Sequence, residues 1–463
     1  MQTAVPGSQL ILGLVIGIAV LVVLILKTKI HAFTSLIFAA VVTGLIAGLT
    51  PTKVASSITS GFGSTLGSIG IVIGFGVMMG RILEVSGAAE RMALTFLRLF
   101  GRGREEWAMA ATGYVTSIPI FCDSGYVILS PLAKALSRRT GKSGAALGVA
   151  LAIGLVATHH AVPPTPGPLA VAGLFHIDLG LMILAGLIFA VPVVIAGVIY
   201  AKWWGKRNYI LPDANGEYHE VAPAEAAAAT AGGNDADVFK RDLPSAFMAF
   251  TPLILPIILI LLNTILTAVF GSKPPLWAQY LILFGNPVVA VGIGLVVAIY
   301  GLMAKAPQGD VLKQLEKGMS SAGIIILVTG AGGALGQVMR DTGVGNYVAQ
   351  QIAATAIPPI LLPFIVATLV RLVQGSGTVA MMTSASITAP ILASMPVNPV
   401  LAAQAAALGA MVFSYFNDSY FWVVNRMLGI EDVKKQIMTW SVPTTIGWAV
   451  SLVMLLIASA FIH

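Results

Sequence analysis

Long apolar runs without charged residues constrain this chain more than any other feature of its sequence. A membrane-spanning helix needs about 20 mostly apolar residues. The stretches that qualify as spans, or as large parts of spans, are Ser8–Leu26, Phe33–Leu49, Ala145–Thr158, Leu179–Tyr200, Phe247–Phe270, Leu276–Met303, Gly323–Gly336 and Thr444–Phe461. Only 10% of the residues are charged, against roughly 25% in soluble domains. We therefore expect an all-α, polytopic membrane protein.

The first apolar stretch is expected to remain as a span, because no basic segment precedes it and no small-residue cleavage site follows it. The single cysteine, Cys122, excludes an intramolecular disulfide framework and a multi-cysteine metal cluster. We predict no metal site and no cofactor.

The formal charge of +7 indicates membrane topology rather than nucleic-acid binding, because the basic residues gather in short loops. These clusters are Lys27/Lys29, Arg98/Arg102/Arg104, Lys134/Arg138/Arg139/Lys142, Lys202/Lys206/Arg207, Lys305/Lys313/Lys317 and Lys434/Lys435. Placing all of them in the cytoplasm puts both the N-terminus and the C-terminus outside. The predicted location is a bacterial inner membrane.

One stretch, Gly205–Asp242, has the composition of a flexible cytoplasmic linker, with an alanine run, Gly232-Gly233 and several charges. It divides the chain into a first membrane repeat (1–204), a linker (205–242) and a second membrane repeat (243–463).

Matching glycines indicate that the two halves are related. The glycines at 67, 74, 76, 80 and 87 recur at 323, 330, 332, 336 and 343, always 256 residues later (323 − 67 = 256). The predicted topology runs the two copies in opposite directions, so the repeat is expected to be inverted. Inverted repeats are typical of transporters that alternate between two openings. Both copies contain a GxxxG spacing, which we interpret as ordinary close packing.

Four interruptions break the apolar pattern, two in each half and in the same order. The first pair, Ser117–Tyr126 and Arg371–Thr378, is predicted to form the tips of re-entrant hairpins. The second pair, Thr158–Pro168 and Ser414–Tyr420, is predicted to form broken helices. Non-helical backbone at membrane depth persists only where protein or a wet cavity surrounds it. The half-helix N-termini at these breaks are suited to binding a carboxylate.

Ionisable residues at these breaks are the strongest functional signals, because burying each charge in a membrane costs roughly 2.5–3.5 kcal/mol. We expect Arg371 either to contact a substrate anion or to pair with an aspartate. Asp123, Asp418 and His159 are the candidates for proton coupling. The predicted substrate-binding residues are Ser124, Gly125, Thr158, His159, His160, Arg371, Gln374, Gly375, Ser376, Gly377, Thr378, Asn417 and Asp418. Serine, threonine and asparagine oxygens at the same breaks are equally suited to sodium.

Several of these stretches resemble the gluconate permease family of proton symporters, a branch of the ion-transporter superfamily. The matching stretches are LGSIGIVIGFGVMMGRILEVSGAAERMA from Leu66, FCDSGYVILSPLAKA from Phe121, THHAVPPTPGP from Thr158, QGSGTVAMMTSASI from Gln374 and SYFNDSYFWVVNR from Ser414. The resemblance implies proton-coupled uptake of a sugar acid such as gluconate, fructuronate or idonate, or of D-serine or a similar small acid. It also implies an elevator-type transport domain that moves against a homodimeric scaffold.

Two other classes of function are alternatives to a secondary transporter. An intramembrane serine hydrolase would use Ser376 with His159 or His160 as its base, but Ser124-Gly125 repeats the feature and a nucleophile is not expected twice. A passive channel has less need of inverted symmetry. We therefore predict a transporter and not an enzyme.

Overall fold

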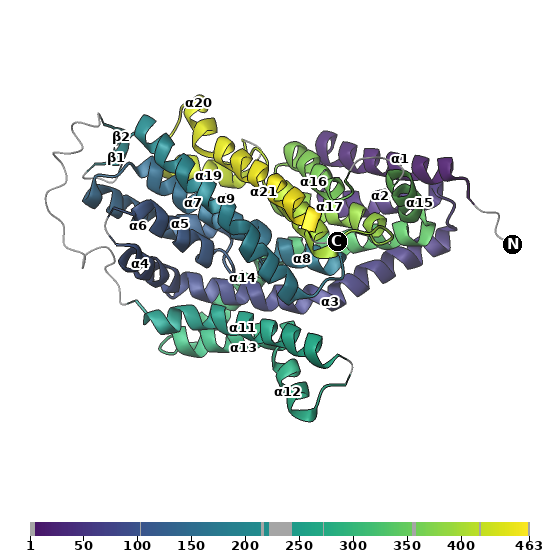
Figure 1. Cartoon of the computed structure of the whole chain (residues 1–463), viewed down its shortest axis with the longest axis horizontal. Coiled ribbons are helices and arrows are strands. Elements are labelled where there is room, and N and C mark those ends of the chain that lie inside the picture. Colours follow the sequence, from purple (N-terminus) through teal and green to yellow (C-terminus); the bar gives the residue numbers. More distant parts are fainter. Residues whose placement is uncertain are drawn as a thin grey trace.

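The computed structural model of the chain describes residues 5–101, 103–213, 217–221, 243–271, 273–353, 358–415 and 418–461. In these residues the fold is a bundle of helices with one small β-hairpin, as expected for an all-α membrane protein (Figure 1). The helices of the first half are α1 (Gly7–Lys27), α2 (Ala32–Ile46), α3 (Pro51–Val85), α4 (Ala88–Phe100), α5 (Glu105–Thr116), α6 (Cys122–Thr140), α7 (Gly144–Ala161), α8 (Pro166–Leu174) and α9 (Leu179–Arg207).

The second half contains a similar series of helices, after the short strands β1 (Ile210–Pro212) and β2 (Tyr218–Glu220). They are α11 (Ala246–Phe270), α12 (Leu276–Phe284), α13 (Pro287–Leu302), α14 (Gln308–Thr342), α15 (Val344–Ala353), α16 (Leu361–Gln374), α17 (Gly377–Leu392), α18 (Pro399–Gly409), α19 (Ser419–Met427), α20 (Val433–Gln436), a π-helical turn η2 (Ile437–Ser441) and α21 (Val442–Phe461).

Five of the described helices are long and apolar enough to cross a membrane, or up to seven if each bent pair counts as one span. The stretch Leu276–Met303, predicted as a span or part of one, consists of two helices, α12 and α13, bent by 59°. The bend has a local cause: the Asn286 side chain caps the backbone N–H of Val288 and Pro287 begins the new helix. Proline is favoured at a first helical position but cannot continue a preceding helix.

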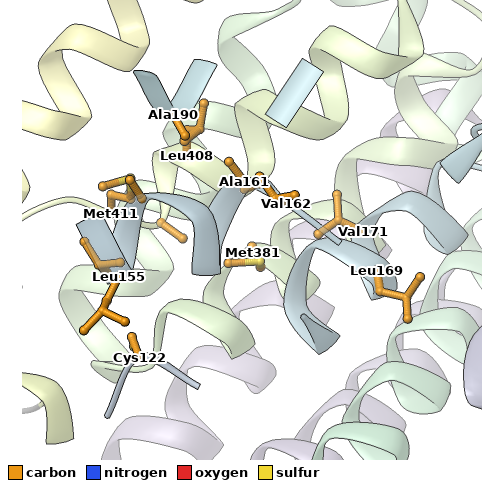
Figure 2. Close-up of a cluster of buried hydrophobic side chains, with 14 of the residues drawn as sticks. Cys122, Leu155, Ala161, Val162, Leu169, Val171, Ala190, Met381, Leu408 and Met411 are labelled. Carbon is orange, nitrogen blue, oxygen red and sulfur yellow. The ribbon is translucent and has the colours of Figure 1, made fainter. Parts of the chain in front are cut away.

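The core surrounds α7, in which every residue from Gly144 to Ala161 is buried. A helix that is apolar on all sides is stable only at the centre of a bundle. Figure 2 shows part of this core, where Leu155 and Ala161 of α7 lie among side chains of α8, α9, α17 and α18. The core therefore contains residues from both halves of the chain.

The two longest helices, α3 and α14, pack against each other in opposite directions along their whole length. Near one end, Lys53 pairs with Asp341 at 3.3 Å. Near the other end, the Arg81 Nε donates to Gln314 at 2.9 Å. In between, the helix backbones approach closely where Gly61 and Gly333 face each other. We call this contact the α3–α14 seam.

The GxxxG glycines of α3 pack against non-helical segments instead of another helix. A Cβ on Gly76 would lie 3.3 Å from the carbonyl oxygen of Pro164, and one on Gly80 would collide with the carbonyl oxygen of Pro119. Each glycine thus holds one of the two breaks of the first half against α3. These contacts agree with the interpretation of GxxxG as close packing, except that α3 packs against loops here and not against a second helix.

The predicted flexible linker begins with ordered structure, so part of that prediction is wrong. Helix α9 continues to Arg207, and β1 pairs antiparallel with β2 in the register Ile210↔Glu220. The hairpin contacts both halves, since Tyr209 donates to Gly141 while Glu220 pairs with Lys435. Packing against Gly144 buries Tyr218 and raises the pKa of its phenol. Most of the remaining predicted linker, 222–242, lies outside the described residues.

Candidate functional site

All four predicted interruptions coincide with helix ends, and three of the helices that begin there line one cavity. Helix α6 begins at Cys122, α17 at Gly377 and α19 at Ser419. The cavity has a volume of about 290 Å³. Its lining residues are Cys122, Asp123, Val156, His159, His160, Arg371, Gly375, Ser376, Gly377, Thr378, Asp418, Ser419 and Tyr420. We call it the central cavity.

Most of the predicted site residues meet in the central cavity. The structure brings together Asp123, His159, His160, Arg371, Gly375, Ser376, Gly377, Thr378 and Asp418. Residues of both predicted hairpin tips, Asp123 in the first and Gly375 to Thr378 in the second, therefore line one space.

Three predicted residues lie elsewhere, and two fall outside the description. Ser124 points into a different cavity. Gly125 packs against Leu155, and the Thr158 hydroxyl is buried and bonds the Gly154 carbonyl at 3.4 Å. In each case the prediction followed the motif, whereas one step along a helix turns a side chain by about 100°. The Gln374 side chain and Asn417 lie outside the described residues.

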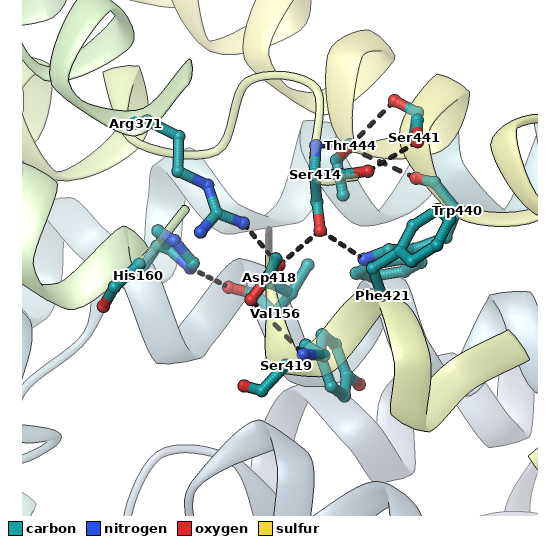
Figure 3. Close-up of polar contacts among 12 residues, drawn as sticks. Val156, His160, Arg371, Ser414, Asp418, Ser419, Phe421, Trp440, Ser441 and Thr444 are labelled. Atoms are coloured by element: carbon teal, nitrogen blue, oxygen red, sulfur yellow. Dashed lines mark hydrogen bonds and ion pairs between the residues drawn. The ribbon is translucent and has the colours of Figure 1, made fainter. Parts of the chain in front are cut away.

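Arg371 forms a buried ion pair with Asp418, the aspartate alternative that the sequence left open. The Arg371 Nη2 lies 2.5 Å from the Asp418 Oδ2, and the two side chains are 5% and 11% exposed (Figure 3). Asp418 also accepts hydrogen bonds from the Ser414 hydroxyl and, at 3.3 Å, from the Tyr420 backbone N–H. It is thus the N-cap of α19 as well as the partner of the arginine.

A second layer of hydrogen bonds holds Ser414 in place. The Trp440 Nε1 donates to the Ser414 Oγ at 2.9 Å, and the Ser414 backbone N–H donates to Thr444 at 3.1 Å. In Figure 3, Ser414, Trp440 and Thr444 lie on the side of Asp418 away from Arg371. Ser414 does not line the cavity, so Asp418 is also held in place from outside it.

Several polar atoms at the cavity are buried and have no hydrogen-bond partner among the described residues. They are the Nε and Nη1 of Arg371, the Oδ1 of Asp123, the Nδ1 of His159 and the Nε2 of His160. Buried polar groups are nearly always hydrogen-bonded. The set contains charged donors, a carboxylate acceptor and two imidazoles, which together match the carboxylate and hydroxyl groups of a small hydroxy acid.

Helix N-termini add a favourable field for an anion. The N-terminal residues of α6, α17 and α19 line the cavity, and each helix N-terminus carries about half a positive charge. The turn before α17 is made possible by Gly375, whose φ is +86°. The Ser376 side chain caps α17 by accepting the Val379 N–H at 3.4 Å.

Sequence reasoning missed four lining residues: Cys122, Val156, Ser419 and Tyr420. Cys122, Ser419 and Tyr420 lie inside the predicted interruptions, within two residues of Asp123 or Asp418. Only Val156 lies outside them, four residues before His160 on the same face of α7. Its carbonyl contacts the His160 Nδ1 at 3.0 Å.

Comparison with known proteins places this chain among permeases. The model of the GntP family permease matches residues 9–461. A permease of Haemophilus influenzae is 51% identical over 97% of this chain and 92% of its own length. The gluconate permease of Pseudomonas aeruginosa is 34% identical over 98% of both chains. The Gnt-II system L-idonate transporter of Escherichia coli is 30% identical over 96% of this chain and 98% of its own.

Two solved structures share the fold at low sequence identity. The YdaH transporter of Alcanivorax borkumensis superposes with a TM-score of 0.66 at 16% identity, over 93% of this chain and 98% of that one. MtrF of Neisseria gonorrhoeae, from a class of antimetabolite efflux pumps, also has a TM-score of 0.66, at 13% identity, over 96% of this chain and 97% of that one.

Proposed function

This chain belongs to the GntP family of permeases, and on that premise we propose that it imports a small sugar acid such as gluconate together with a proton. It is a multi-pass bacterial membrane transporter and not an enzyme, since its relatives are named permeases and transporters. The relatives named for gluconate or L-idonate support a hydroxy acid as the substrate.

The proposed substrate is supported above all by the guanidinium of Arg371, because only part of its hydrogen-bonding capacity is used by described residues. One of its nitrogens binds Asp418, while Nε and Nη1 are buried at the cavity without a described partner. A guanidinium has five N–H donors, so it can bind Asp418 with one nitrogen and offer its other donors to the carboxylate of a substrate. A volume of about 290 Å³ lies at the small end of the roughly 300–1,000 Å³ of ligand pockets, which suits a small acid.

The charge balance of the cavity supports proton coupling. Arg371 contributes +1, while Asp123 and Asp418 contribute −1 each, so the three groups sum to −1. A bound carboxylate would make the sum −2, and uncompensated charge is costly in a low-dielectric environment. A proton on Asp123 restores the sum to −1. Substrate and proton are therefore expected to bind together.

Matching elements in the two halves support an inverted repeat. Helix α3 spans 51–85 and α14 spans 308–342, both displaced by 257 residues (308 − 51 and 342 − 85). Helix α9 corresponds to the span 433–461 at a displacement of 254 (433 − 179 and 461 − 207). Counterpart helices that run antiparallel, as in the α3–α14 seam, are what two oppositely oriented repeats require.

The remaining proposals concern orientation and assembly. We place both termini outside the bacterial inner membrane and the linker in the cytoplasm, with membrane repeats at 1–204 and 243–463. The unit that carries both tips would move against a scaffold, and the scaffolds of two chains would form a homodimer. Light scattering of purified protein, corrected for bound detergent, measures the oligomeric state.

Uptake into vesicles tests the function. Purified protein in liposomes is given labelled gluconate with an inward proton gradient, an inward sodium gradient or neither. The expected result is accumulation above equilibrium on the proton gradient only, abolished by a protonophore. About 100 mV of proton driving force corresponds to 2.3 kcal/mol, or roughly 50-fold accumulation. Accumulation on sodium alone would reject proton coupling, and equilibration without accumulation would indicate a channel.

A further inference from the structure

A second cavity lies on the other side of the first hairpin tip. It has a volume of about 340 Å³. Its walls come from α3, from the residues that lead into α6 and from α14, and its lining residues include Arg81, Glu84, Phe121, Ser124, Lys317 and Ser320. Lys317 and Ser320 are exposed, so the cavity is open to the surface of the molecule along α14. We call it the vestibule.

One short stretch separates the two cavities. Cys122 and Asp123 line the central cavity, whereas Phe121 and Ser124, the residues on either side of them, line the vestibule. The Phe121 ring also lies 5.8 Å from the ring of His159, which belongs to the central cavity. The wall between the cavities at this point is therefore a single turn of chain with one aromatic ring.

The charges of the vestibule favour an anion. Arg81 pairs with Glu84 at 2.7 Å and donates to Gln314 at 2.9 Å, and the two charged side chains are 26% and 21% exposed. With Lys317 at the rim, the three charged groups sum to +1, whereas Asp123, Arg371 and Asp418 of the central cavity sum to −1. A charged cleft with low-dielectric walls concentrates ions of the opposite sign.

We propose that the vestibule is a second binding station for the transported carboxylate, in which Arg81 and Lys317 hold the anion before it passes Phe121 or after it leaves. Naming the anion as the transported acid rests on the proposed function. Because Arg81 is already paired with Glu84 and Lys317 is exposed at the rim, this station binds weakly and is sensitive to salt. Weak binding suits a station that must release its ligand at every cycle.

The cysteine content of the chain allows a direct test that needs no transport. With Cys122→Ser, which removes the single native thiol, Ser124→Cys places one thiol at the vestibule. Its reaction rates with an anionic sulfonatoethyl methanethiosulfonate and a cationic trimethylammonioethyl methanethiosulfonate are compared. The ratio of the two rates is expected to fall about threefold or more when Lys317→Gln or Arg81→Gln is added.

The matched control is Lys313→Gln, because Lys313 is exposed on the same helix one turn away and does not line the vestibule. It should leave the rate ratio unchanged. Equal ratios for Lys317→Gln and Lys313→Gln would overturn the proposal. Ser320→Cys, on the α14 wall, replaces Ser124→Cys if the first variant fails to fold, and the same outcomes apply.

Gluconate uptake provides the second readout. We expect Lys317→Gln to raise the KM for uptake about threefold while leaving equilibrium binding at the central cavity as in wild type. An unchanged KM would contradict the role as a station on the path. If wild-type protein carries no gluconate, the proposed function fails, whereas the thiol rates still decide whether the vestibule attracts anions.

Discussion

Two aspartates share the central cavity, but the protein holds them differently. Asp418 accepts hydrogen bonds from Arg371, Ser414 and Tyr420. Asp123 accepts one long hydrogen bond, 3.4 Å from the Ser419 hydroxyl, and its Oδ1 has no partner among the described residues. A carboxylate with many fixed donors serves as an anchor, whereas one with few can gain and lose a proton.

Asp123→Asn is therefore expected to abolish accumulation of gluconate on a proton gradient while sparing exchange of internal for external gluconate. The amide keeps the shape of the side chain but cannot bind and release a proton at physiological pH. Counterflow in liposomes measures exchange, and uptake on a pH gradient measures coupling. A variant that still concentrates gluconate would show that another residue carries the proton.

Arg371→Lys is expected to weaken gluconate binding about tenfold, or about 1.4 kcal/mol, without unfolding the protein. Lysine keeps the charge that Asp418 needs but presents no second fixed donor for the substrate. Isothermal calorimetry measures the Kd. Arg91→Lys is the matched control, because Arg91 binds the Pro244 carbonyl away from the cavity. Binding as tight as wild type would mean that Arg371 acts on Asp418 alone.

At this scale the sequence located the site but not the direction of each side chain. Asp123, Arg371 and Asp418 were predictable because charges within apolar runs are rare and costly. Ser124 was misplaced because the tip alternates its side chains between two cavities. The Arg371–Asp418 partnership depends on how α16 meets α19, which spacing along the chain cannot specify.

Among the helices, glycines decide how closely α3 meets the broken segments. Gly80 touches the carbonyl of Pro119 and Gly76 lies near that of Pro164, so the first tip and the broken helix both rest on α3. Proline and glycine made the breaks themselves predictable. The loops that the glycines contact were not, because GxxxG in a membrane sequence usually indicates a second helix.

Gly80→Ala is expected to reduce uptake about tenfold or more, since the added methyl group would force the tip away from α3. Gly74→Ala, six residues earlier in the same helix, is the control, because a Cβ there has no heavy atom within 4 Å. Alanine in a helix interior even gains up to about 1 kcal/mol over glycine. Both variants are compared by uptake and by thermal unfolding. Equal uptake by the two variants would show that transport does not depend on the contact between Gly80 and the first tip.

Across the whole molecule, the α3–α14 seam joins the two halves and ends in a charged cluster. Burial alone would raise the pKa of Asp341, but hydrogen bonds from Ser57 and Gln337 and the ion pair with Lys53 outweigh it. The pKa of Asp341 therefore lies below its ordinary value. A lowered pKa in the folded state stabilises the protein above the unfolded-state value of about 3.9, and this contribution disappears as the pH falls through the folded-state pKa.

Asp341→Asn is expected to lower the apparent Tm at pH 7 by about 2 °C, the size typical of a partly exposed ion pair. The difference from wild type should shrink as the pH falls below about 4, where the wild-type carboxylate becomes protonated. Differential scanning fluorimetry in detergent across this range is the measurement. A difference that stays constant with pH would assign the effect to the hydrogen bonds rather than to the charge.

The seam also has a consequence for biosynthesis. The ends of α3 and α14 are 257 residues apart (342 − 85), which at 5–20 residues per second corresponds to roughly 13–50 s of translation. For that time the nascent first half sits in the bilayer with the Gly61 face of α3 uncovered. Lipid or an insertion chaperone has to cover that face of α3 until α14 has been synthesised and inserted.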